Sequence, residues 1–219
     1  MRGIGHKSQK QGSFLKLEGQ HRYSYGGVLR QKRKGRGQRP LSTKESIHLV
    51  FKLDPLRLKH RSLRSPQVFL LSQKIIQSYA KRFFVKVEQI SIQHNHIHLL
   101  IRTSKRSLYQ YFFRVVAGQI AQRLEKAGLL AQVHQVSRQS VTDTPPAQGG
   151  KSKTSFGKAR LWIYRPFTRV VRGHKAYKIV VEYIRLNEFE VRGLIRYSKQ
   201  RLKGLSSAEW IILRQTLLK

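Results

Sequence analysis

The chain has 219 residues and carries 45 Lys and Arg against 10 Asp and Glu, a formal net charge of +35 that predicts a polyanionic partner, nucleic acid first of all. Aliphatic and aromatic residues make up 39% of the sequence, which is too many for a wholly disordered basic tail and enough for one domain with appendages. The lack of cysteine excludes disulfides, cysteine-ligated zinc and thiol catalysis, and the few acidic residues leave little scope for paired-carboxylate chemistry. No apolar run approaches a membrane span and no signal peptide opens the chain, so we expect an intracellular protein.

The first forty residues are strongly basic. They hold eleven Lys or Arg with one acidic residue, and the stretch from Arg30 to Arg39 has no hydrophobic side chain to bury. We therefore predict that Met1–Pro40 is a flexible arm that follows DNA phosphates, with Arg33, Arg36 and Arg39 among its contacts. The alternative is a merely solvated tail or a localisation signal.

From Leu41 onward the hydrophobic spacing alternates between the periods of strands and helices. The period of two predicts strands over Ile47–Phe51, Phe84–Ile92 with a bulge near Glu88, Asn95–Arg102, and Leu161–Val171 with an interruption at Pro166. The helical period predicts helices over Ser65–Phe83, Ser107–Lys126 and Lys175–Glu190, and a short one after the capping-box sequence Ser206–Glu209.

This order of elements predicts an α+β domain, with helices on one face of a mainly antiparallel sheet of the ferredoxin-like or RRM-like kind. The domain is expected to span residues 41–195, followed by a helical extension over 196–219. Residues 135–158 are rich in Gly, Pro, Ser and Thr and hold almost no apolar side chain, so we expect a long mobile insertion loop there.

One predicted strand carries a cluster of histidines. On this strand His94, His96 and His98 would line the open face, while Ile97 and Leu99 would point into the core. Two imidazoles spaced by one residue on a rigid strand can converge on a divalent metal ion. The alternative is a set of ordinary polar side chains on an exposed sheet face.

The third predicted helix offers a phenol and a carboxamide on one face. Tyr183 and Asn187 are four residues apart and therefore lie one turn from each other. A phenol beside a metal ion, in a strongly positive protein, is a candidate nucleophile towards phosphodiesters, and a nearby carboxamide is a candidate oxygen ligand. Tyr109, Tyr111 and Tyr177 are rival phenols that spacing alone does not exclude.

The segment Asn95–Leu100 resembles the His-hydrophobic-His motif of the single-tyrosine HUH transposases, most of all that of the REP-associated tyrosine transposases. In that branch a Trp-containing strand precedes a helix with the pattern Tyr-Ile-x-x-Asn-Pro. Trp162 followed by Tyr183–Asn187 is similar in order and spacing. The resemblance covers about Arg39 to Glu190.

The resemblance implies a ferredoxin-like sheet with the His pair at its centre and the Tyr helix laid across it. His96, His98 and Asn187 would hold Mg²⁺ or Mn²⁺, and Tyr183 would attack single-stranded DNA, leaving a 5′-phosphotyrosine and a free 3′-OH that can rejoin strands. It also implies a monomer or homodimer in the bacterial cytoplasm, associated with the nucleoid. Glu188 departs from the pattern because it stands where the family usually has Pro.

Further DNA contacts are expected around this site. The candidates are Arg114 and Arg123 on the second helix, Arg165 and Arg169 beside the Trp strand, and Trp162, which could stack on unpaired bases. The alternative function is non-catalytic, as an RNA-recognition protein or a domesticated binder of repeat hairpins. Imidazoles rather than aromatic rings on the open face favour the enzyme over an RNA-recognition domain.

Overall fold

The computed structural model describes residues 23–29, 38–131 and 160–215. The predicted insertion at 135–158, together with Arg33 and Arg36, lies outside these residues. The main elements are β2 (Ile47–Lys52), α3 (Pro66–Arg82), β3 (Lys86–Ile92), β4 (His96–Arg102), α4 (Arg106–Lys126), β5 (Phe167–Val170) and α5 (His174–Val191).

All strands belong to one antiparallel sheet in the order β1-β5-β2-β4-β3, where β1 is Ser24–Tyr25. From β2 to β5 the element order is βαββαβ, which is the ferredoxin-like arrangement and confirms the predicted α+β class. The β3–β4 register shifts between Val87 and Gln89, so the predicted bulge near Glu88 is present. The last strand begins only after Pro166, which cannot donate a ladder hydrogen bond.

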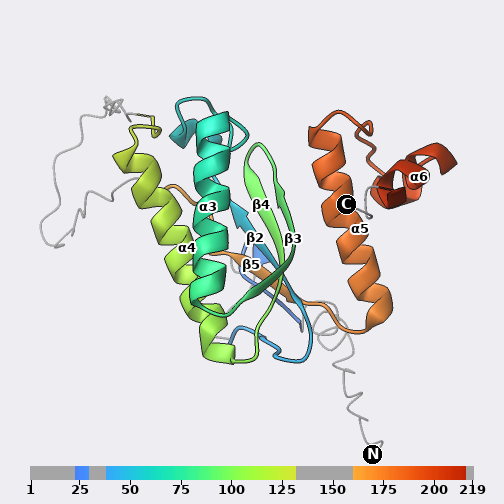
Figure 1. Cartoon of the computed structure of the whole chain (residues 1–219), viewed down its shortest axis with the longest axis horizontal. Coiled ribbons are helices and arrows are strands. Elements are labelled where there is room, and N and C mark those ends of the chain that lie inside the picture. The colour runs from blue at the N-terminus through green and yellow to red at the C-terminus, as the bar shows by residue number, and fades with distance from the viewer. Residues whose placement is uncertain (1–22, 30–37, 132–159, 216–219) are drawn as a thin grey trace, which may run out of the picture.

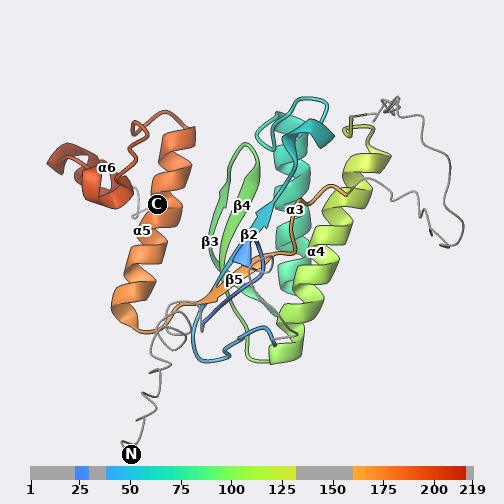
Figure 2. The same ribbon diagram turned by 180° about the vertical axis from the view of Figure 1, so that it is seen from behind.

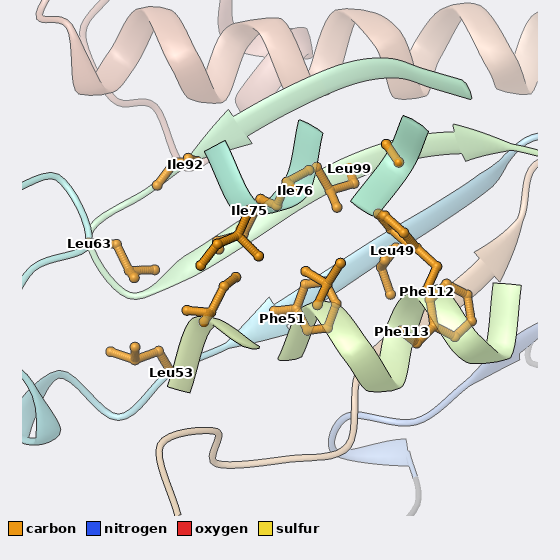
Figure 3. Packing of buried hydrophobic residues seen from close by; sticks show 14 of the residues in the cluster. Leu49, Phe51, Leu53, Leu63, Ile75, Ile76, Ile92, Leu99, Phe112 and Phe113 are labelled. Atoms are coloured by element: carbon orange, nitrogen blue, oxygen red, sulfur yellow. The ribbon is translucent and has the colours of Figure 1, made fainter. Parts of the chain in front are cut away.

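The main core lies between one face of the sheet and the two helices α3 and α4 (Figure 3). The inward residues alternate along the two central strands and are at most 1% exposed: Ile47, Leu49, Phe51, Ile97, Leu99 and Ile101. Burying each such side chain contributes about 1.5–3 kcal/mol, so the alternation fixes which face of each strand looks inward.

The third helix, α5, lies on the opposite face of the sheet (Figures 1 and 2). It packs against β3 and β4, where Ile184 is buried with Leu100 and Val171 in a second apolar cluster. The prediction that all helices share one face is therefore wrong for α5. The reason is that Leu100 alternates with the inward-facing Leu99 and Ile101, so its face also offers an apolar surface for a helix to cover.

The C-terminal part packs on α5 through a third cluster that includes Leu186, Phe189 and Leu213. It contains the 3₁₀ helix η2 (Arg201–Gly204) and α6 (Ser207–Gln215). The capping box forms as predicted. The backbone N–H of Ser206 donates to a Glu209 carboxylate oxygen at 2.8 Å, and that of Glu209 donates back to Oγ of Ser206 at 3.3 Å.

The N-terminal segment differs from the predicted arm. Ser24 and Tyr25 pair with β5, so this part of the predicted arm adds a short edge strand to the sheet. The Arg39 guanidinium donates to the carbonyl oxygen of Pro166 and to Oγ1 of Thr168, both at 3.0 Å, and lies 5.2 Å from the ring of Phe113. The Arg39 side chain is therefore packed on the domain and does not extend into solvent as part of a flexible arm.

Candidate active site

Three imidazoles gather on the sheet face that α5 partly covers. His48 lies on β2, while His96 and His98 lie on the neighbouring strand β4. In the antiparallel register Val50 pairs with His98 and Lys52 pairs with His96, which places all three imidazoles on the same face. The ring centroids are 5.2 Å apart for His48 and His98, and 4.6 Å apart for His96 and His98. The structure thus brings the predicted histidine pair together and adds a third ring.

His98 is the most enclosed of the three and is 5% exposed. Its Nδ1 lies 3.0 Å from Nε2 of His48. Its Nε2 is buried and has no hydrogen-bond partner among the described residues. Leaving a buried polar atom unpaired costs about 1–3 kcal/mol, so this nitrogen is free to pair with a ligand or a water molecule.

Tyr183 lies beside this cluster on α5. Its half-buried ring is edge-on to the imidazoles, with centroids 5.7 Å from His98 and 6.4 Å from His48. The Arg201 guanidinium covers the ring at 5.2 Å. Among the other tyrosines on the described helices, none has a ring contact with these histidines, and Tyr109 is fully buried with its hydroxyl accepting from the N–H of Thr103 at 3.0 Å.

Asn187 follows one helical turn after Tyr183 and is 5% exposed. Its side-chain oxygen accepts a hydrogen bond from Arg201, and its Nδ2 is buried without a partner in the described part of the chain. The Gln93 side chain donates to the Asn187 backbone oxygen at 2.7 Å and to Oγ of Ser91 at 2.8 Å. Gln93 therefore anchors the helix at this point to the sheet that carries the histidines.

Arg201 closes the site from the C-terminal segment. It forms a bidentate ion pair with Glu190 at 2.8 and 2.7 Å, and its guanidinium lies 5.2 Å from the rings of both Tyr183 and Tyr197. One guanidinium thus contacts the candidate nucleophile and the candidate oxygen ligand Asn187. No sequence signal marked this residue, because it lies in a segment that was predicted only as a helical extension.

Burial lowers the pKa of all three imidazoles. The pKa of His48 and that of His96 fall from 6.5 to about 4, and the pKa of His98 lies well below 6.5. Positive charges add to this effect, from Arg169 beside His48 and from Arg201 beside His96 and His98. The three rings are therefore neutral at pH 7 and keep a lone pair available for a metal ion or a hydrogen bond.

We expect this cluster to make the fold sensitive to acid. At pH values above 6.5 His48 is neutral in both the folded and the unfolded chain, whereas between about 6.5 and 4 only the unfolded chain binds the proton. His48 alone should lower the free energy of unfolding by on the order of 3 kcal/mol across that range. Urea unfolding from pH 7 to 4.5 measures the loss, and the His48→Gln variant should show a flatter profile. A wild-type stability that does not change with pH would contradict buried neutral imidazoles.

The donor set at the site fits a divalent ion. His96 Nδ1 lies 2.6 Å from Oδ1 of Asn95, an oxygen that can only accept, so Nε2 of His96 carries a free lone pair. With Nε2 of His98 and the oxygen of Asn187 the set is two nitrogens and one oxygen, which suits Mn²⁺ or Mg²⁺ with water in the remaining positions. No three His, Asp or Glu side chains in the described regions are arranged to hold a metal ion. The Arg201 guanidinium would have to leave the Asn187 oxygen, because like charges repel.

Two of the predicted DNA-binding arginines lie near the site. Arg169 is exposed and pairs across the strands with His48, and Arg165 lines a cavity of about 280 Å³ on the part of this face beside β2 and β5. Phe167 and Lys52 also line the cavity. Because Lys52 pairs with His96, the cavity begins next to the histidine cluster.

The other predicted DNA contacts do not converge on Tyr183. Arg114 and Arg123 are exposed on α4, which covers the opposite face of the sheet. Trp162 packs against Phe51 in the main core with ring centroids 5.3 Å apart, and its indole N–H donates to a backbone oxygen of α4 at 2.9 Å. The partly buried indole therefore belongs to the main core, and the structure does not present it as a stacking surface.

Glu188, which departs from the pattern that the sequence resembles, and the predicted third histidine His94 both lie away from the histidine cluster. The Glu188 carboxylate accepts from Arg64 at 3.1 Å, from Arg192 at 2.8 Å and from Oγ of Ser91 at 3.2 Å. It is thus held by two arginines and does not compete for the position between the imidazoles. His94 lies in the exposed turn before β4, with its Nδ1 2.9 Å from a serine hydroxyl, and is not on the face where it was predicted.

Neither a family model nor a curated protein matches the sequence. The solved structures to which the chain is similar include the following two. One is a putative transposase from Deinococcus radiodurans R1, with 16% identity, a TM-score of 0.39, and coverage of 68% of this chain and 92% of that chain. The other is the REP-associated tyrosine transposase bound to a REP hairpin, with 12% identity, a TM-score of 0.47, and coverage of 74% and 77% respectively. No helix in the described regions is long and apolar enough to cross a membrane.

Proposed function

We propose that this protein is a transposase-like DNA strand transferase that cuts and rejoins single-stranded DNA next to a hairpin. The observation that carries the proposal is the edge-on contact of the Tyr183 ring with His98, whose Nε2 is buried without a partner in the described residues, one turn from the Asn187 carboxamide. A phenol, two neutral imidazoles and a carboxamide form a site for phosphodiester chemistry that needs neither cysteine nor an acidic cluster.

In this proposal the Tyr183 hydroxyl oxygen forms a bond to phosphorus while the bond from phosphorus to the 3′ oxygen breaks. The phenol gives up its proton, the 3′ oxygen gains one, and the products are a 5′-phosphotyrosine and a free 3′-OH. The phosphodiester energy is kept in the new ester, so a 3′-OH can attack it and rejoin strands without ATP. When bound at His96, His98 and Asn187, Mg²⁺ or Mn²⁺ would polarise the scissile phosphate.

The DNA strand is proposed to run over the part of the site face beside β2 and β5. Lys52 and Arg165 at the cavity, with the exposed Arg169 next to them, supply positive charge beside the histidine cluster. Phe167 in the cavity lining offers an aromatic ring for an unpaired base. Phosphate contacts of this kind give salt-dependent affinity without base specificity.

A covalent adduct is the direct test of the proposal. The full-length protein is incubated with hairpin oligonucleotides that carry labelled single-stranded flanks, with and without Mn²⁺, and is resolved on a denaturing gel. We expect a labelled protein band that requires Mn²⁺ and single-stranded DNA. Hairpin binding without any adduct would instead favour a non-catalytic binder, a function that the Arg201 contact with the Asn187 oxygen would suit.

A further inference from the structure

We propose that His48 is a positioning residue that holds His98 in the Nδ1–H tautomer, so that the lone pair on Nε2 of His98 faces into the site. The inference rests on the proposed function, since that lone pair is the one that would bind the divalent ion. Neither the histidine motif nor the tyrosine helix includes His48, which lies on a different strand.

The contact between the two rings allows only two proton arrangements. Nε2 of His48 and Nδ1 of His98 are 3.0 Å apart, so one nitrogen donates and the other accepts. In the first arrangement His98 donates from Nδ1, and its buried Nε2 is a lone pair. In the second His48 donates, and Nε2 of His98 becomes a buried N–H with no acceptor in the described part of the chain.

The charge around the site favours the first arrangement. The Arg201 guanidinium lies 5.2 Å from the Tyr183 ring, and that ring lies 5.7 Å from His98, so the surroundings of His98 are positive. Positive surroundings favour a free lone pair over an N–H dipole. His96, the other candidate nitrogen ligand, has the same arrangement, with its proton on Nδ1 and its lone pair on Nε2. The oxygen of Asn95, which can only accept, holds Nδ1–H on His96 and leaves Nε2 free. Each imidazole of the pair would therefore have its own partner that fixes its tautomer, Asn95 for His96 and His48 for His98.

His48 is also rigid enough for this role. It is 9% exposed, its ring plane lies within 17° of that of His98, as an in-plane N–H···N bond requires, and the ring of Phe167 abuts it edge-on at 6.5 Å. Strand pairing on both sides of β2 fixes its backbone, because β4 and β5 flank it. The acceptor atom is therefore held in place before any ligand arrives.

The first experiment reads the tautomer in the metal-free, full-length protein. The protein is labelled with ¹⁵N-histidine, and two-bond proton–nitrogen correlations identify which ring nitrogen of His98 carries the proton. The His98 signals are assigned from their loss in a His98→Gln variant. We expect the proton on Nδ1. A proton on Nε2 of His98 would overturn the proposal, and this result needs no cleavage activity.

The second experiment measures Mn²⁺ affinity from the EPR signal of the free ion. His48→Phe keeps an aromatic ring but removes the acceptor, and it should weaken Mn²⁺ binding by about 10- to 100-fold. His48→Gln restores an acceptor oxygen near the Nε2 position and should recover most of that affinity. His94→Gln replaces an exposed histidine next to the same strand, so its affinity should match the wild type.

The possible outcomes separate this role from the proposed function. Equal Mn²⁺ affinity of the wild type and a folded His48→Phe protein would overturn the role of His48. A failure of His48→Gln to recover affinity that His48→Phe has lost would do the same, because it would indicate a packing role only. Absence of Mn²⁺ binding by the wild-type protein would instead count against the metal-dependent function. The tautomer measurement would still show whether His98 carries its proton on Nδ1, as the role of His48 requires.

Discussion

Replacing Tyr183 by phenylalanine is expected to abolish strand cleavage and the covalent adduct, by more than about 1,000-fold, while hairpin binding stays near the wild-type level. The substitution removes one oxygen and keeps the ring, which contacts His98 at 5.7 Å and the Arg201 guanidinium at 5.2 Å. A group needed only for bond formation leaves ground-state binding unchanged. Cleavage gels and a binding titration on the same labelled hairpin give the two readings.

The rival tyrosines provide matched controls for this test. Tyr111 is 55% exposed on α4, and Tyr177 lies on α5 itself, so Tyr111→Phe and Tyr177→Phe should both form the adduct at the wild-type level. Tyr109→Phe is a poorer control because it leaves the buried Thr103 N–H unpaired, at a cost of about 1–3 kcal/mol in stability. Mass spectrometry of the adduct peptide decides the matter. DNA attached to a tyrosine other than Tyr183 would refute the proposed nucleophile.

Replacing either His96 or His98 by alanine is expected to reduce cleavage to an undetectable level or to raise the Mn²⁺ requirement sharply. Each substitution removes one of the two nitrogen ligands proposed here, and no other carboxylate or imidazole in the described residues completes a three-residue cluster. The His98 side chain is only 5% exposed, so replacing it by alanine leaves a buried cavity. A loss of stability should therefore accompany the loss of activity. Initial cleavage rates across a Mn²⁺ titration measure the effect.

Two comparisons make this result specific. His94→Ala changes the exposed histidine two residues before His96 and should cleave like the wild type. His96→Ala is the more informative variant, because His96 is only half-buried and its loss disturbs the fold less than that of His98. Full cleavage by a folded His96→Ala or His98→Ala protein at limiting Mn²⁺ would show that the ion, if one is used, binds elsewhere.

The basic arm must be redefined before truncation experiments. Removing residues 1–39 would delete β1, which pairs with β5. It would also delete the Arg39 side chain, which donates hydrogen bonds to the Pro166 carbonyl oxygen and to Oγ1 of Thr168. Such a truncation would mix a loss of phosphate contacts with damage to the sheet edge. A truncation before Tyr23 leaves both features in place.

The site could be predicted from sequence only in part. Alternation along β4 placed His96 and His98 on one face, and helical spacing placed Tyr183 and Asn187 one turn apart, because both patterns act within a single element. The same reasoning failed for Trp162, since the indole packs on Phe51 of another strand. It missed His48 even though its position on the face opposite the core was visible in the alternation of β2, because alternation within one strand does not give the register that brings His48 to His98 on the neighbouring strand.

The sequence by itself determined the α+β class, the order of strands and helices, the bulge at Glu88 and the capping box at Ser206. These features depend on the period of apolar residues and on local hydrogen bonds, which neighbouring residues fix without help from the rest of the chain. Only the tertiary structure decided that His48 meets His98 and that Arg201 contacts Tyr183 and Asn187. Such contacts join segments that are far apart in the chain. They depend on strand pairing and on the pairing of buried charged groups, and a local sequence pattern predicts neither.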